Sequence, residues 1–175
     1  MKKVFLDTEF TRAGLNTSLI SVGMVSEDGE TLYLQLNDYD RTQVTPWLKD
    51  NILCLLEGSA VSSAEASIII AEWLEHVRRG QWIQLVSAGK LFDVLLLFNL
   101  WAEVEDGSTL KTWRGRLPEC MAHKHHLDLD TAFFLHGINP DIDRASFAGC
   151  MEEHRHNALS DALVVKACWE KLFSE

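Results

Sequence analysis

The first ten residues place two acidic side chains directly after a short apolar run. Val4-Phe5-Leu6 is wholly apolar, which is typical of a central strand buried on both faces. Asp7 and Glu9 follow with one residue between them, so in a strand both carboxylates project to the same side. Two such carboxylates repel each other unless a cation lies between them, and Mg²⁺ is bound by few carboxylates with positions left open for phosphate oxygens. The pattern indicates a metal-dependent phosphoryl-transfer site, although a solvated strand end is the simpler interpretation of these two acids alone.

Length, composition and charge limit the classes of protein that remain. A chain of 175 residues with 47% hydrophobic and 24% charged residues is typical of one globular domain spanning residues 1–175. The net charge of −10 argues against a protein that grips long stretches of nucleic acid, which normally carries a basic face. A nucleic-acid substrate would therefore be held at a short end, with metal ions supplying positive charge.

The sequence predicts a cytoplasmic protein without a membrane partner. Lys2-Lys3 precede an apolar run, as in a signal peptide, but Asp7 ends that run early. The most apolar later stretch, residues 94–102, is too short to cross a bilayer and contains Asn99. The four cysteines show no paired spacing, which is typical of reduced thiols.

The residue pattern predicts an α/β fold whose sheet begins as an antiparallel meander. Strands are expected over residues 4–6, 18–25 and 31–36, and Glu27-Asp-Gly-Glu30 between the last two is a strong hairpin signal. A fourth strand is expected over residues 82–86, after the first helices. The expectation is one α/β domain with a central mixed sheet, its first three strands antiparallel, flanked by helices.

Helices are expected where a capping residue precedes an apolar face. Thr45-Pro46 is typical of the beginning of a helix, here through about residue 56. Ser62 and Glu65 match a capping box for a second helix, which Gly80 would end. The remaining expectations are a helix over 92–104, a short strand near 110–113, a short helix capped by Asp128 or Asp130 and ending near 136–137, a loop over 138–154, and a last helix over 158–173.

Two further acids and a histidine occur where the predicted elements can bring them to the end of the first strand. Asp93 follows the fourth strand and a glycine turn, and Asp161 lies one turn into the last helix. Ala158 and Ala162 would let that helix approach the sheet closely. His156, five residues before Asp161, is placed to remove a proton from an attacking water. Four carboxylates suit two divalent ions roughly 3.5–4 Å apart.

The spacing of His156 and Asp161 recurs elsewhere, so context selects this pair. The same spacing occurs at His123/Asp128, His125/Asp130 and His136/Asp141. The acids of the first two pairs are better interpreted as helix caps, and the third lies in a loop without a helix behind it. Only His156 and Asp161 combine a loop for the histidine with a sheet-packing helix for the aspartate.

Three short motifs occur in order along nearly the whole chain: Asp7-Thr-Glu9-Phe10, Phe92-Asp93 and His156-Asn-Ala-Leu-Ser-Asp161-Ala. Together they resemble the motifs of the DEDDh 3′→5′ exonucleases. Small size and the strand Ile20-Ser-Val-Gly23 make the chain most similar to the mycobacterial-type exoribonucleases among them. The resemblance implies an RNase H-like fold, two Mg²⁺ or Mn²⁺ ions per site, RNA 3′ ends as substrate, release of nucleoside 5′-monophosphates, and commonly a homodimer.

The resemblance also implies roles for single residues. Asp7, Glu9, Asp93 and Asp161 would bind the metals, and His156 would be the general base. Phe10 and Leu15 would wedge against terminal bases, although a phenylalanine after a strand is more often part of the core. Arg144 and Arg155 flank the site in sequence and are candidates for contacts to substrate phosphates.

Other interpretations remain open. The enzyme would act on RNA, DNA or short oligonucleotides, because the sequence does not show how a 2′-OH is recognised. A non-catalytic nucleic-acid interaction protein on the same fold is disfavoured because every catalytic position is filled. The stretch Cys120-x-x-His123-x-His125-His126 is compatible with zinc, but structural zinc usually has paired cysteines, so a solvated polar loop is preferred.

Overall fold

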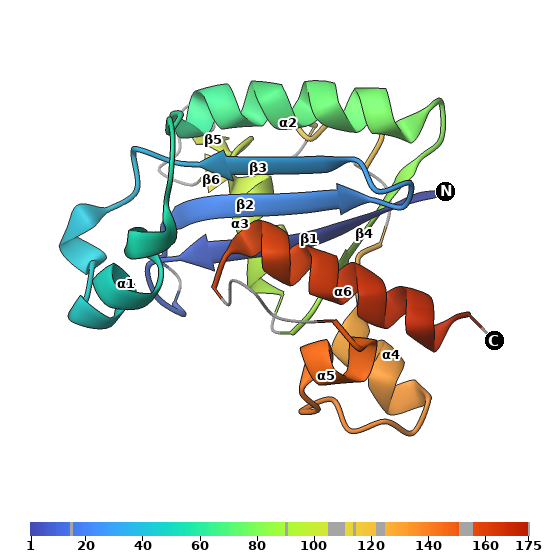
Figure 1. Cartoon of the computed structure of the whole chain (residues 1–175). Helices are drawn as coiled ribbons and strands as arrows, with labels where there is room; N and C mark the ends of the chain where they lie inside the picture. Colours follow the sequence, from blue (N-terminus) through green and yellow to red (C-terminus); the bar gives the residue numbers. More distant parts are fainter. Residues whose placement is uncertain are drawn as a thin grey trace.

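A mixed five-stranded sheet with the strand order β3-β2-β1-β4-β7 forms the centre of the structure (Figure 1). The structure is a computed structural model that describes residues 1–14, 16–89, 91–104, 111–113, 115–121, 125–150 and 156–174. Its strands are β1 (Lys2–Phe10), β2 (Leu19–Ser26), β3 (Thr31–Gln35), β4 (Ile83–Ser87) and β7 (Leu127–Asp128). β1, β2 and β3 form an antiparallel meander, whereas β4 is parallel to both β1 and β7. The predicted mixed sheet with an antiparallel beginning is confirmed.

β1 is the middle strand because its apolar residues face two separate cores. Val4 and Leu6 are buried in the core on one side of the sheet, and Phe5 is buried in the core on the other side. Side chains alternate along a strand, so Asp7 and Glu9 share the face of Phe5. The two acids therefore project toward the helices that cover that face.

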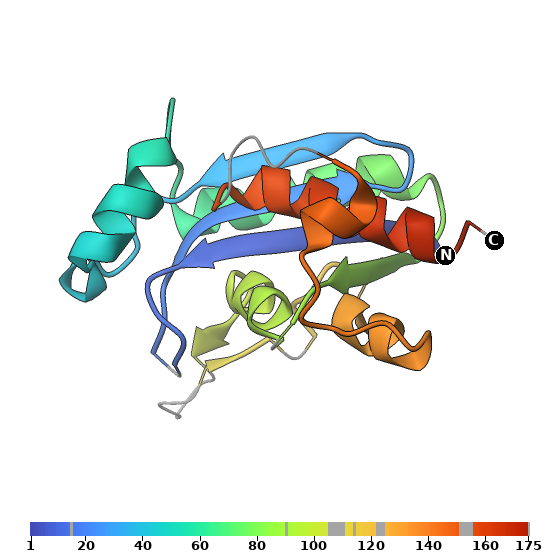
Figure 2. The same ribbon diagram turned by 60° about the horizontal axis from the view of Figure 1, so that its bottom comes forward.

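Helices cover both faces of the sheet (Figures 1 and 2). On the face of Val4, α2 contributes Ile70 and Leu74 and α3 contributes Leu97 to the core. On the face of Phe5, α6 and α4 contribute Val165 and Phe133. The bounds of the helices are α1 (Pro46–Asn51), α2 (Ser63–Arg78), α3 (Phe92–Asn99), α4 (Leu129–Leu135), α5 (Arg144–Ala148) and α6 (Ala158–Leu172).

Side-chain caps begin several of these helices as predicted. Thr45 accepts a hydrogen bond from the backbone of Leu48 at the start of α1. Ser62 and Glu65 form the capping box of α2 in full. Asp128 accepts from the backbone N–H of Thr131 and so caps α4. These caps satisfy backbone donors that have no partner within the helix.

Two predicted helix ends and one predicted loop are wrong. The first helix ends at Asn51 and is followed by a separate 3₁₀ turn, η2 (Leu53–Leu55). α3 ends at Asn99, and β5 (Glu103–Val104) then pairs with β6 (Lys111–Thr112). Periodicity alone did not show this end, because Leu100 and Trp101 still pack on the core after the helix has tightened into turns. The predicted loop over 138–154 contains α5, which Asp143 caps through the N–H of Ser146.

The four cysteines are free thiols in the structure. Cys120 and Cys168 are buried thiols, Cys150 is half-buried and Cys54 is exposed. Among the described residues, no helix combines the length and the apolar composition that a membrane span needs.

α6 begins in very close contact with β2 at Gly23. A Cβ atom built on Gly23 would lie 2.2 Å from the carbonyl carbon and oxygen of Ala158 and 2.3 Å from the N of Leu159. Ala158 and Ala162 are fully buried here, so small side chains continue the contact along the helix. Gly23 pairs directly with Asp7 across the β1–β2 ladder. The contact therefore sets the first turn of α6 beside the acids of β1.

We expect Gly23→Ala to lower the free energy of unfolding by about 1–3 kcal/mol or more, as overpacking of a close-packed site does. The added methyl group would force α6 away from β2. Chemical denaturation measures the change. Gly14→Ala is the matched control, because a Cβ atom there meets nothing within 4 Å, and its effect should stay within about 0.5 kcal/mol. Equal stability of the two variants would contradict the close approach of α6.

Candidate active site

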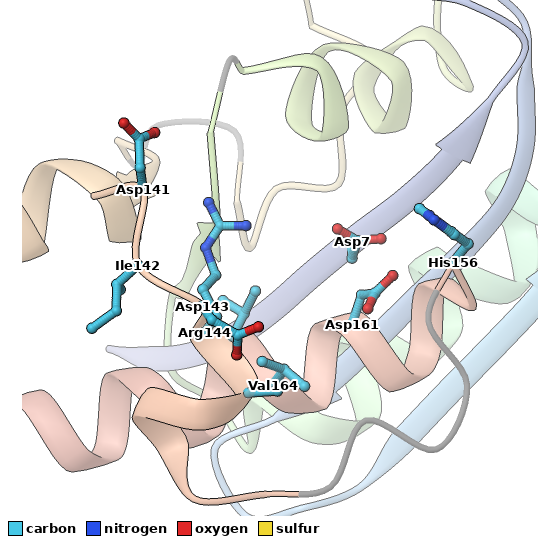
Figure 3. A pocket seen from close by; sticks show the side chains of 10 residues that line it. Asp7, Asp141, Ile142, Asp143, Arg144, His156, Asp161 and Val164 are labelled. Atoms are coloured by element: carbon cyan, nitrogen blue, oxygen red, sulfur yellow. The ribbon is translucent and has the colours of Figure 1, made fainter. Parts of the chain in front are cut away.

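Three carboxylates from two elements meet at the C-terminal end of β1. Asp7 and Glu9 project from β1, and Asp161 lies in the first turn of α6. One oxygen of each carboxylate lies within 4.8 Å of the other two. Figure 3 shows the side chains of Asp7 and Asp161 facing one another. Hard divalent cations take oxygen ligands at about 2.0–2.6 Å, so the three oxygens fit around one such ion after small side-chain adjustments.

Asp93 adds a fourth carboxylate from α3. Its Oδ1 accepts hydrogen bonds from the backbone N and the Oγ1 of Thr8, at 3.1 and 2.7 Å. Thr8 lies between the two acids of β1 and projects to the opposite side of the strand, where α3 packs. Asp93 is only 6% exposed, so these two bonds fix a nearly buried carboxylate at the same edge of the sheet.

His156 stands at the start of α6, directly before the capping residue Asn157. Its backbone has φ 67°, in the left-handed region that costs a non-glycine residue roughly 1–2 kcal/mol. The imidazole makes an edge-to-face contact with the indole of Trp47 in α1, with ring centroids 5.3 Å apart. In Figure 3 the imidazole lies beside Asp7 and Asp161. The aromatic contact helps to hold His156 in this unusual conformation.

The acids and His156 line one open cleft. Two adjoining cavities, of about 410 and about 510 Å³, share five lining residues: Asp7, Asp141, Arg144, His156 and Asp161. The second cavity also reaches Glu9 and Asp93. The structure thus brings all five predicted catalytic residues to one cavity. It also places there Asp141 and Arg144, which the sequence does not predict to be catalytic.

Of the residues predicted to contact substrate, the structure describes Phe10 but not Leu15 or Arg155. Phe10 lines the cleft and stacks on Phe92, with ring centroids 5.4 Å apart. It also packs against the core beside α3, so it belongs to both the core and the cleft wall. Leu15 and Arg155 lie outside the described residues.

The stretch from Cys120 to His126 does not gather a second metal site in the part that the structure describes. Cys120 is buried, His126 lies with its Nε2 2.9 Å from Ser87 Oγ, and His123 lies outside the described residues. Within the described ranges, Asp7, Glu9 and Asp161 are the one group of three or more side chains placed to share a metal. The preference for a polar stretch over a zinc site stays a prediction.

Burial and neighbouring negative charges raise the pKa values of the clustered acids. Burial, followed by the charges of Asp93, Asp161 and Glu9, raises the pKa of Asp7 well above its usual range. Burial, followed by the charges of Asp161 and Asp93, raises the pKa of Glu9 to about 8. Burial raises the pKa of Asp93 to about 6, against the hydrogen bonds from Thr8. Without a cation, part of the cluster therefore holds protons at neutral pH, and a divalent ion would displace them.

The chain is similar in sequence to known exonucleases. No family model matches it. Two curated proteins, each named a 3′-5′ exoribonuclease and each from a strain of Mycobacterium tuberculosis, are 35% identical to it over 103 residues. The matched region covers 57% of this chain and 61% of each relative, so the chain spans less than two thirds of the length of these proteins. The expected resemblance to 3′-5′ exoribonucleases is thereby confirmed by sequence similarity over 57% of the chain.

Two solved structures of E. coli exonuclease I share the fold. One is a zinc-bound complex with single-stranded DNA, and the other a complex with a dA16 oligonucleotide. They match 98% and 99% of this chain and 40% and 41% of their own, with TM-scores of 0.63 and 0.64 and identities of 12% and 10%. Identities this low show the fold alone. The fold is the RNase H-like fold of these exonucleases, as predicted.

Because the pKa of Glu9 is raised, we expect the free energy of unfolding to fall as pH rises. A carboxylate whose pKa is lowered on folding has the opposite effect. In the unfolded chain Glu9 titrates at the ordinary glutamate pKa of 4.5, whereas in the folded protein without divalent ions its pKa is about 8. The folded protein binds more protons between these two values, so the free energy of unfolding falls as pH rises through this window. Discounted for partial exposure, we expect Glu9 to contribute on the order of 2 kcal/mol of this fall. Glu9→Gln should flatten it.

Chemical denaturation in EDTA at pH 5.5 and pH 8 measures the effect. Adding Mn²⁺ at pH 8 should restore the stability that wild-type protein loses, because the ion replaces the displaced protons. Glu72→Gln, at an exposed position of α2, is the matched control and should keep the wild-type slope. A wild-type slope in the Glu9→Gln variant would show that Glu9 does not hold the proton.

Proposed function

We propose that this chain is a metal-dependent 3′→5′ exonuclease that acts on RNA and releases nucleoside 5′-monophosphates. The observation that carries the proposal is the meeting of Asp7, Glu9 and Asp161 within 4.8 Å, beside His156 in one cleft. The exonuclease fold and the 35% identity to proteins named 3′-5′ exoribonucleases support it. RNA is preferred because these relatives carry that name.

The carboxylates provide the ligands for two divalent ions, Mg²⁺ or Mn²⁺. Asp7, Glu9 and Asp161 would hold one ion, Asp7 would also contact the second, and Asp93 would complete the cluster. When bound, such ions activate a water and stabilise the charge on the phosphate oxygens. The proton displacement described above makes this binding stronger as pH rises.

His156 acts as general base. Its position beside Asp7 and Asp161 lets the imidazole accept a proton from a water that attacks the last phosphodiester of a bound strand. The bond from phosphorus to the 3′-oxygen of the preceding nucleotide then breaks, which leaves a shortened strand with a 3′-OH and a free 5′-monophosphate. Trp47, through its ring contact, keeps His156 directed to the acids.

The substrate is held over a short length. A net charge of −10 repels a polyphosphate backbone everywhere except where cations gather. The cleft, with cavities of about 410 and 510 Å³, is the place where metal ions supply that charge. A strand end therefore binds in preference to an internal segment.

DNA or a short oligonucleotide is the second candidate substrate. The exonuclease I structures that share the fold contain single-stranded DNA and a dA16 oligonucleotide, which supports DNA as the alternative. A non-catalytic role on the same fold is disfavoured, because all five residues of the proposed mechanism line the cleft. Cytoplasmic location and assembly as a homodimer stay predictions from the sequence.

We expect the protein to shorten single-stranded RNA stepwise from its 3′ end in Mg²⁺ or Mn²⁺. Matched labelled RNA and DNA, single-stranded and with 3′ overhangs, distinguish the two substrates on a sequencing gel, with EDTA as the metal-free control. Asp161→Ala should abolish hydrolysis because it removes a ligand of the cluster, whereas Glu72→Gln on α2 should not change it. Cuts within a circular RNA, or full activity in EDTA, would refute the proposal.

We expect His156→Ala to lower kcat by about 10²–10⁴-fold, the usual contribution of general-base catalysis. Because the acids remain, the variant should still bind Mn²⁺ with near wild-type affinity in a calorimetric titration, whereas Asp161→Ala should lose both activity and ion binding. His76→Ala, on the exposed surface of α2, is the matched histidine control. Near-normal turnover of His156→Ala would assign the base to another group.

A further inference from the structure

Arg144 is the one lysine or arginine among the described residues that line the cleft. The other charged residues of this lining are acids: Asp7, Glu9, Asp93, Asp130, Asp141, Asp143 and Asp161. The charge of Arg144 reaches the cluster, since it lowers the pKa of both Asp7 and Asp93 against the dominant effect of burial. A cation so placed is available to an anionic substrate that enters the same cleft.

A hydrogen bond to α4 fixes one nitrogen of the guanidinium group of Arg144. Arg144 is the first residue of α5, and its Nη2 donates a hydrogen bond of 2.7 Å to Oδ1 of Asp130 in the first turn of α4. Gly89, just after the end of β4, leaves room for this pair, because a Cβ atom there would lie 3.1 Å from Asp130 Oδ2. The pair thus holds the arginine in a fixed direction over the edge of the sheet.

One donor of Arg144 has no partner within the described part of the chain. Its Nε is buried and has no hydrogen-bond partner among the described residues. Burial of a donor without an acceptor is unfavourable, so the guanidinium group keeps hydrogen-bonding capacity that Asp130 does not use. A guanidinium group matches the oxygens of a phosphate, to which it donates more than one hydrogen bond.

The position of Arg144 in the cleft indicates which phosphate it meets. In Figure 3 the carboxylates of Asp7 and Asp161 lie between His156 and Arg144. In an in-line displacement the water and the leaving oxygen are on opposite sides of the phosphorus. If His156 activates the water, the leaving 3′-oxygen and the rest of the strand extend to the side of Arg144.

We propose that Arg144, braced by Asp130, binds the phosphate group immediately 5′ of the scissile phosphodiester. This inference rests on the proposed function for the direction of the strand. Arg144 then contributes to substrate binding on the leaving side, and the 5′-phosphate of a dinucleotide becomes a recognised group. Asp130 is a positioning residue that acts through the arginine.

A comparison of two dinucleotides measures the effect of this one phosphate on hydrolysis. ApA carries only the scissile phosphate, and pApA adds one phosphate at the predicted position. Wild-type protein should have a kcat/KM for pApA at least about 10-fold above that for ApA, as expected for a charge-assisted hydrogen bond. In Arg144→Gln this ratio should fall close to one, and in Arg144→Lys it should be intermediate. Arg78→Gln, which removes the same charge from α2, should keep the wild-type ratio.

The ratio also identifies failure of the inference. An Arg144→Gln variant that keeps the wild-type ratio, or a wild-type ratio near one, would overturn it, and thermal melting checks that the variants are folded. Competition binding of both dinucleotides in Ca²⁺ repeats the comparison without hydrolysis. If Arg144→Gln no longer binds pApA more tightly than ApA in this assay, the role of Arg144 is supported even when the protein hydrolyses neither dinucleotide. Absence of hydrolysis would refute only the proposed exonuclease activity. Equal affinities of wild type and Arg144→Gln for pApA would overturn the role of Arg144 alone.

Discussion

The close packing of α6 on β2 at Gly23 is the contact on which the site depends. Gly23 is the ladder partner of Asp7, so a helix that begins against Gly23 begins beside Asp7. Asp161 follows one turn later and reaches the two acids of β1. Any side chain at position 23 would occupy the space of the Ala158 backbone. The missing Cβ atom of one residue in β2 thus decides whether three carboxylates from distant parts of the sequence can share a ligand.

That convergence has an electrostatic cost which the rest of the fold must offset. Burial disfavours the charged form of a carboxyl group, and nearby like charges add to this effect. Burial, followed by neighbouring carboxylates, raises the pKa of Asp7 and Glu9, and burial raises the pKa of Asp93. β1 tolerates them because its earlier residues are buried in two cores, which hold the strand whatever its end carries. Thr8 directs Asp93, and Arg144 balances part of the charge. Without a cation, part of the site therefore holds protons, and in the proposed function divalent ions would displace them.

The sequence predicted the parts of this arrangement that depend on local patterns. The acids of β1, the meander and the caps at Ser62 and Asp128 follow from alternation, turn chemistry and capping. The sequence did not show that α3 stops at Asn99, because the apolar residues after it also pack on the core. It missed α5, because a helix of five residues has no measurable periodicity and its cap, Asp143, lies in a polar run. The signals that could have found it are Asp143, a residue type favoured at the N-cap, and Gly149 at the end of the helix. The sequence offers Asp130 as a possible cap, whereas its partner is Arg144, fourteen residues away. No local pattern reveals this pairing.

The missed helix changes how an acidic protein can hold an acidic strand. With a net charge of −10, the surface as a whole opposes binding, and the cations that favour it must act at short range. In the proposed function, metal ions held by the acids would act on the scissile phosphate itself. α5 places Arg144 where a second phosphate would follow, and Asp130 keeps the guanidinium from turning to the acids of β1. Two neighbouring phosphates would then meet positive charge, and phosphates farther along the strand would meet the general repulsion. In the proposed function, selectivity for a strand end would follow from this distribution of charge.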